Sequence, residues 1–81
     1  TFDAILTNPP IRAGNRVVFR LMEDCAESLR PGGVFWLVGR RRQGLATLQR
    51  RMEGCFGRVE QAALKAGYRV LRATEPRYTR P

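Results

Sequence analysis

A short apolar run followed at once by an Asn-Pro-Pro turn constrains this chain more than any other stretch. Residues 2–11 read FDAILTNPPI. The run at residues 4–6 is short and apolar enough to predict a strand buried on both faces, as in a parallel sheet. Neither Pro9 nor Pro10 has an N–H for a ladder, and Pro9 disfavours helical backbone at Asn8, so the strand must end there. We therefore expect Asn8 at the carboxyl end of a buried strand, where open α/β sheets bind ligands.

The chemistry of this turn suits an amine. An Asn8 side chain held beside a proline carbonyl offers two acceptors at a set spacing, which fits an exocyclic amino group on a base or an amide nitrogen. Asn-Pro is also an ordinary turn signal, and on the dipeptide alone that interpretation is the commoner one. The preceding strand, the second proline and the segments that follow favour a ligand-binding role.

The next segments predict a crossover unit. Asn15 is a good N-cap, and apolar residues at helical spacing predict a helix over residues 16–30. A Pro-Gly-Gly sequence at 31–33 ends it. The continuous apolar run at 34–38 predicts a second buried parallel strand, with Trp36 in the core. Strand, helix and strand together make one right-handed crossover.

A second helix and a hairpin complete the prediction. The helix spans about 46–55, and Gly57 ends it. Residues 59–64 and 68–73 predict an antiparallel hairpin with its turn at Ala66-Gly67. The tail at 75–81 has no apolar periodicity and is expected to fray. The inner stripe of the second helix comprises Leu45, Leu48, Met52, Cys55 and Phe56.

Charge and cysteine content narrow the partners. The net charge is +8, from 15 basic against 7 acidic residues, and the pI is about 11.3. Such a balance suits a polyanion, nucleic acid first. There is no His, and Cys25 and Cys55 fall on predicted apolar helix faces, so we interpret them as small core residues rather than a disulfide or metal pair. No apolar run approaches the ~20 residues that span a bilayer, and we expect a cytoplasmic, metal-free protein without membrane contact.

In order and spacing, the segments NPPIRAG, LRPGGVFWLV, RRRQG, FGRVE and GYRVLRA resemble one family over residues 1–74. The FDAILTNPPI stretch is similar to motif IV of class I S-adenosylmethionine-dependent methyltransferases that act on planar amino groups. The series as a whole resembles the ribosomal RNA small-subunit guanine-N2 methyltransferase-like family. The resemblance implies an α/β fold, the C-terminal half of a Rossmann-like methyltransferase sheet.

That resemblance implies a site and a cofactor. Asn8, Pro9 and Pro10 match the residues that hold the target amine, so they are the expected catalytic residues. The cofactor implied is S-adenosyl-L-methionine. No G-x-G-x-G loop and no acidic residue ending a second strand occurs here, so the cofactor-binding residues are unknown. The chain begins on a strand without Met, and we expect residues 1–81 to be a partial domain, inactive alone, whose partners are ribosomal RNA and a missing N-terminal half.

Several residues near the motif are expected to bind substrate. Adenine-N6 enzymes usually carry an aromatic residue at the position of Ile11, and an aliphatic one fits the guanine-N2 branch better. Arginines should gather at the same sheet edge as Asn8, where they would contact RNA phosphates or form a solvated charged face. They are Arg12, Arg16, Arg40, Arg41 and Arg42. Gln43-Gly44 and Gly67-Tyr68 match family positions without a chemical role that we could derive.

Other functions remain open from the sequence. One is glutamine-N5 methylation of a protein or adenine-N6 methylation, for which an aromatic residue at the position of Ile11 would be more usual. Another is a non-catalytic RNA-binding half that lends its basic face to a partner domain. A Gly-rich turn after a strand, upstream of Thr1, would favour the enzyme.

Overall fold

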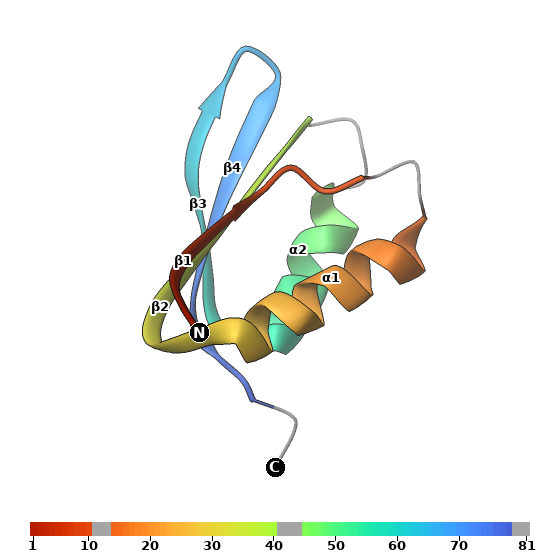
Figure 1. Cartoon of the computed structure of the whole chain (residues 1–81). Helices are drawn as coiled ribbons and strands as arrows, with labels where there is room; N and C mark the ends of the chain where they lie inside the picture. Colours follow the sequence, from red (N-terminus) through yellow and green to blue (C-terminus); the bar gives the residue numbers. More distant parts are fainter. Residues whose placement is uncertain (11–13, 41–44, 79–81) are drawn as a thin grey trace.

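Strands and helices alternate along the computed structural model, which describes residues 1–10, 14–40 and 45–78 (Figure 1). The predicted order of strand, helix, strand, helix and hairpin is confirmed. The elements are β1 (Phe2–Thr7), α1 (Asn15–Ser28), β2 (Leu29–Arg40), α2 (Leu45–Cys55), β3 (Phe56–Lys65) and β4 (Tyr68–Pro76).

The strands form one mixed sheet in the order β1-β2-β4-β3. Strands β1 and β2 are parallel, with Thr7 opposite Leu37, and α1 connects them as the predicted crossover. Strand β4 returns antiparallel beside β2, and β3 pairs with the outer edge of β4. The predicted hairpin and its turn at Ala66-Gly67 are also confirmed. A parallel pair extended by an antiparallel hairpin is the sheet expected from the resemblance.

Both helices cover the same face of the sheet (Figure 1). Apolar residues of α1 and α2 pack there against alternate residues of β2 and β4, as the period of two in a strand requires. The rings of Phe35 and Phe56 stack at the centre, with centroids 5.2 Å apart. The guanidinium of Arg51 on α2 pairs with Glu23 on α1 and lies 5.1 Å from the Phe19 ring. The buried core comprises Val18, Met22, Cys25, Ala26, Leu29, Phe35, Leu37, Leu48, Met52, Cys55, Phe56, Leu71 and Ala73.

The opposite face of the sheet, which we call the open face, is covered by no element within the described ranges. Directly paired residues share a face, so the register assigns the open face its apolar members: Ala4, Leu6, Val34, Trp36, Val38 and Val70. Leu6 is 73% exposed, so the prediction that residues 4–6 are buried on both faces is wrong for this chain. Trp36 is only half-buried, beneath the guanidinium of Arg72. Its assignment to the core is therefore wrong as well, because none of the described elements forms a second layer against it.

Three predicted boundaries differ from the structure. Gly14, with φ of 100°, occupies the N-cap position of α1 without a side-chain cap, and Asn15 is already helical, so Asn15 is not the N-cap. Helix α1 ends at Ser28 rather than at residue 30, because Leu29 adopts extended backbone and begins β2. Phe56 begins β3 instead of ending α2.

The C-terminal residues remain hydrogen-bonded to the rest of the fold beyond the position at which fraying was predicted. Strand β4 continues through Pro76, and the Arg77 N–H donates to the Cys55 carbonyl at 2.8 Å. The Tyr78 hydroxyl donates to the Leu29 carbonyl. Fraying that begins at Glu75 is therefore wrong, and residues 79–81 lie outside the described part of the chain.

Candidate functional site

The carboxyl ends of β1 and β2 lie side by side at the end of the sheet where the hairpin turn also projects (Figure 1). Thr7 ends β1 opposite Leu37, and Arg40 ends β2 three residues later. Asn8 follows β1 directly and is exposed, whereas Pro9 is buried. Pro9 thus anchors the turn and leaves Asn8 accessible, which confirms the position predicted for Asn8 but does not test its role.

The same edge carries positive charge. Arg16 lies exposed in the first turn of α1, and Arg40 is exposed at the end of β2. Both helices begin at this edge, and neither has an acidic residue in its first turn. Their positive dipole ends add to the charge of the arginines. The predicted site residues Ile11, Arg12, Arg41 and Arg42, with Gln43-Gly44, lie outside the described ranges.

Acidic residues are segregated from this edge. All seven acidic residues of the chain fall in the described ranges, and their places in the elements are elsewhere. Asp3 is near the start of β1, Glu23, Asp24 and Glu27 are in the second half of α1, Glu53 is near the end of α2, Glu60 is in mid-β3 and Glu75 is at the far end of β4. The edge that bears Asn8, Arg16 and Arg40 therefore favours the binding of an anion. A carboxylate that could hold a cofactor ribose is lacking at the edge, so these residues do not fit that part of S-adenosylmethionine.

One contact between two side chains at this edge was not predicted from the sequence. Arg40 and Tyr68 are cross-strand partners on β2 and β4. The Arg40 Nε–H donates to the Tyr68 hydroxyl over a long 3.4 Å, and the guanidinium lies 5.7 Å from the ring centroid. Gly67-Tyr68 was noted in the sequence without a role, because only the strand register shows that Tyr68 faces Arg40.

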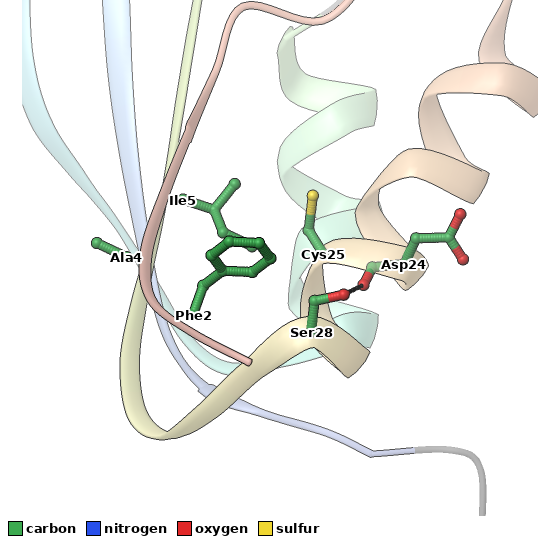
Figure 2. Close-up of a pocket in the computed structure, with 6 residues that line it drawn as sticks. All are labelled: Phe2, Ala4, Ile5, Asp24, Cys25 and Ser28. Atoms are coloured by element: carbon green, nitrogen blue, oxygen red, sulfur yellow. Dashed lines mark hydrogen bonds between the residues drawn. The ribbon is translucent and has the colours of Figure 1, made fainter.

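A groove of about 340 Å³ lies at the other end of β1, away from Asn8. Figure 2 shows Phe2 and Ile5 of β1 facing Cys25 of α1 across it. The Ser28 hydroxyl donates to the Asp24 carbonyl at 2.8 Å on the helix side. The groove is mostly apolar and borders the outer edge of β1, so it suits an apolar side chain better than a polar substrate.

The described residues offer neither a metal-ligand cluster nor a membrane-spanning helix. Within ranges 1–10, 14–40 and 45–78, no group of three or more His, Cys, Asp or Glu side chains could hold a metal ion. Neither helix in those ranges is long and apolar enough to cross a bilayer.

Known proteins are similar to this chain in sequence. The family model described as the methyltransferase small domain matches residues 1–72. The uncharacterised protein YbxB of Bacillus subtilis is 41% identical over 73 residues, which cover 90% of this chain and 36% of YbxB. Ribosomal RNA large subunit methyltransferase G of Streptomyces avermitilis is 34% identical over 77 residues, covering 90% of this chain and 20% of that protein. The chain thus spans about a third or less of these relatives.

A solved structure shows the same fold. The 16S rRNA N2 guanine methyltransferase RsmC of T. thermophilus, in complex with AdoMet and guanosine, superposes with a TM-score of 0.90. The match covers 100% of this chain and 22% of that one, at 21% sequence identity. At this identity the match supports the fold, a methyltransferase-type α/β sheet.

Proposed function

This chain belongs to the methyltransferase small domain family, and on that premise we propose that it forms the C-terminal half of an S-adenosylmethionine-dependent methyltransferase domain. The proposed acceptor is an exocyclic amino group, guanine N2 in ribosomal RNA. The observation that carries the proposal is the exposed Asn8, anchored by a buried Pro9 at the carboxyl end of β1. Family membership also confirms the resemblance noted in the sequence.

Asn8 and its neighbours would position the acceptor. An exocyclic amine has two N–H groups, and the Asn8 side-chain oxygen and a carbonyl of the Pro9-Pro10 segment can accept one each. Holding both directs the nitrogen toward the methyl group that S-adenosylmethionine supplies from its positively charged sulfur when bound. The nitrogen lone pair would form the new bond to the methyl carbon as the carbon–sulfur bond breaks, the sulfur would leave as a neutral thioether, and one N–H proton would pass to solvent. The two fixed oxygens would stabilise the partial positive charge that the nitrogen carries before that proton leaves.

The charge distribution favours RNA as the substrate. Arg16 and Arg40 are exposed at the edge that bears Asn8, and the acidic residues lie elsewhere in the elements. Phosphate contacts from such arginines would position RNA without reading its sequence. The names of the S. avermitilis and T. thermophilus proteins, both ribosomal RNA methyltransferases, agree with this choice. A protein glutamine as substrate gives no reason for a basic edge.

We place the cofactor site in the part of the intact protein outside these residues. The edge lacks a carboxylate for a ribose, and the chain spans only 36% and 20% of the two relatives. The open face around Ala4, Leu6 and Trp36 and the unfilled groove beside β1 are the surfaces that the remainder of the domain would cover, while the hairpin end with Arg40 and Tyr68, which extends past the helices, would stay accessible.

Replacing Asn8 in the intact protein tests the proposal. Asn8→Ala should lower methyl transfer to a guanine-containing ribosomal RNA fragment by about 10² to 10³, the usual effect of losing one preorganised polar contact. Cofactor affinity should stay near wild type, because the cofactor contacts come from elsewhere. Radiolabelled methyl incorporation and titration calorimetry measure the two quantities separately.

Asn8→Asp is the control that separates catalysis from turn formation. Asp and Asn are nearly interchangeable in a turn, so a purely structural Asn8 would tolerate Asp. An Asn8 that holds an amine should lose turnover on substitution by Asp while the melting temperature is unchanged. Near-wild-type turnover of both variants would contradict the proposed function.

A further inference from the structure

We propose that Tyr68 and Arg40 form a stacking platform for a nucleotide that neighbours the target base in single-stranded RNA. The inference rests on the proposed function for the identity of the polymer. The residues concerned are outside the Asn-Pro-Pro turn, on the strand ends β2 and β4. The platform would bind a flanking nucleotide by its base plane and its phosphate rather than by its sequence.

The position of the pair suits such a contact. Arg40 ends β2, and Tyr68 begins β4 directly after the hairpin turn, which extends past the helices (Figure 1). Both side chains alternate onto the open face with Val38 and Trp36, because paired residues share a face. Tyr68 remains 42% exposed even with Arg40 beside it. An aromatic ring is therefore accessible at the edge that bears Asn8.

The sheet register sets the distance between Tyr68 and Asn8. Asn8 follows Thr7, which is opposite Leu37, so Asn8 lies level with Val38. Tyr68 is one strand beyond β2 and opposite Arg40, two residues further along. Strand spacings of about 4.8 Å and rises of about 3.3 Å per residue place Tyr68 roughly 12 Å from Asn8. A base held at Asn8 could have its neighbour or next neighbour on Tyr68.

A second Arg–aromatic pair on the open face shows what a purely structural contact looks like here. Arg72 lies 5.7 Å from the Trp36 ring centroid, at the same separation as Arg40 from Tyr68. Arg72 is also neutralised by Glu60 at 2.9 Å, and both Arg72 and Trp36 are half-buried.

Arg40 differs from Arg72 in charge and exposure. No ion pair of Arg40 is found with any residue in the described ranges, and Arg40 is exposed. A free guanidinium beside an accessible ring can hold a phosphate while the ring stacks a base, the combination by which proteins bind single strands. The Arg40–Tyr68 pair thus offers a nucleotide both an accessible ring and a guanidinium without an ion pair in the described ranges. The Arg72–Trp36 pair offers neither.

The test uses the intact protein and a fluorescein-labelled single-stranded RNA of about twelve nucleotides with one guanine. Anisotropy titrations should show Tyr68→Leu binding about tenfold more weakly, the effect of losing one stacked base. Tyr68→Phe keeps the ring and should stay within about threefold of wild type. Arg40→Gln should reduce the slope of log affinity against log salt by about 0.7, one phosphate contact on a single strand.

Leu64→Ala is the matched control. Leu64 is 45% exposed on the same hairpin, but it pairs with Arg69 and so projects from the other face. The Leu64→Ala variant should bind the RNA as tightly as the wild-type protein does. Where Tyr68→Leu lowers the melting temperature by several degrees, the salt slope of Arg40→Gln decides the question instead. An unchanged slope, or equal weakening by Tyr68→Leu and Leu64→Ala, would overturn the platform.

Steady-state kinetics separate this inference from the proposed function. Tyr68→Leu should raise KM for the RNA about tenfold and leave kcat unchanged, whereas Asn8→Ala should lower kcat. Guanine methylation that survives Tyr68→Leu with unchanged KM would refute the platform and leave the proposed function intact. Loss of RNA affinity in Tyr68→Leu, with Asn8→Ala still fully active, would support the platform and refute the role of Asn8.

Discussion

Burial raises the pKa of both cysteine thiols. For Cys25 the main cause is desolvation, and the neighbouring Asp24 carboxylate adds to it. For Cys55 desolvation also dominates, Arg51 opposes it in part, and Glu23 adds to it. Both thiols are free and buried, which confirms their interpretation as small core residues. At neutral pH they are therefore held as thiols, the unreactive form.

Slow alkylation is the expected outcome. In the native protein at pH 7 to 8, iodoacetamide should modify Cys25 and Cys55 much more slowly than in guanidinium chloride, as followed by mass spectrometry. The raised pKa values also imply that the unfolded thiols ionise first as pH rises. Their contribution to stability is therefore complete below the unfolded pKa and is lost as pH rises through the folded pKa. Equal native and denatured alkylation rates would argue against burial of the thiols.

Single residues differ in how far the sequence could place them. Asn8 and Pro9 were located correctly, because two prolines leave a strand no way to continue. Trp36 was not, since an apolar run shows that a strand is buried but not which layers cover it. The Arg40–Tyr68 pair depends on a register between residues 28 positions apart, and no local pattern encodes that.

At the scale of elements, the hairpin turn is held in left-handed backbone. Ala66 has φ of 51° and Gly67 has φ of 81°, the pattern of the turns that best match the twist of two strands. Glycine accepts this conformation freely, whereas alanine pays a steric cost of about 1 kcal/mol. Nothing lies within 4 Å of a Cβ built on Gly67, so the constraint at this turn comes from the backbone alone.

Substitutions in the turn should change stability in opposite directions. Ala66→Asn restores the preferred Asn-Gly pair and should raise the free energy of unfolding by about 0.5 to 1 kcal/mol. Gly67→Ala should lower it by about 1 kcal/mol. Urea titrations of the intact protein measure both, with the m-value as a check that the unfolded states are comparable. A destabilising Ala66→Asn would mean that the turn is of another kind.

Element type was more predictable than element ends. The periodicities of α1 and α2 and the apolar run of β2 identify each element, because burial of one face requires those spacings. The ends depend on which residue first leaves the helix. At Gly33 the backbone turns back so closely that a Cβ would lie 2.9 Å from the Arg30 carbonyl oxygen. The Pro-Gly-Gly segment thus bends inside β2 instead of separating α1 from a later strand.

At the scale of the whole molecule, the described residues form a layer of helices on one face of the sheet and no layer on the other. The outer edge of β1 has no strand beside it in the described residues, and the apolar members of the open face have no covering element there. An unpaired edge beside exposed apolar side chains favours association. We expect the isolated 81-residue chain to self-associate in sedimentation experiments. A monomer that unfolds cooperatively would contradict this.

The effect of Leu6→Lys should depend on what surrounds the chain. In the isolated chain Leu6 is 73% exposed, so a lysine there should be close to neutral for folding and should reduce self-association, as charges on sheet edges do. If the remainder of the domain covers the open face, Leu6 becomes a core residue worth roughly 1.5 to 3 kcal/mol of burial. Leu6→Lys should then lower the free energy of unfolding of the intact protein by at least about 2 kcal/mol.

Leu64→Lys on the hairpin is the matched substitution. Leu64 lies on the face opposite to Leu6, at the exposed end of β3. In the isolated chain and in the intact protein alike, Leu64→Lys should change the free energy of unfolding by no more than about 0.5 kcal/mol, as at an ordinary surface position. Urea denaturation of the intact protein and sedimentation of the isolated chain, each with both variants, complete the comparison. A Leu6→Lys variant as stable as wild type in the intact protein would show that the open face stays uncovered, and the chain would then not be half of a larger domain.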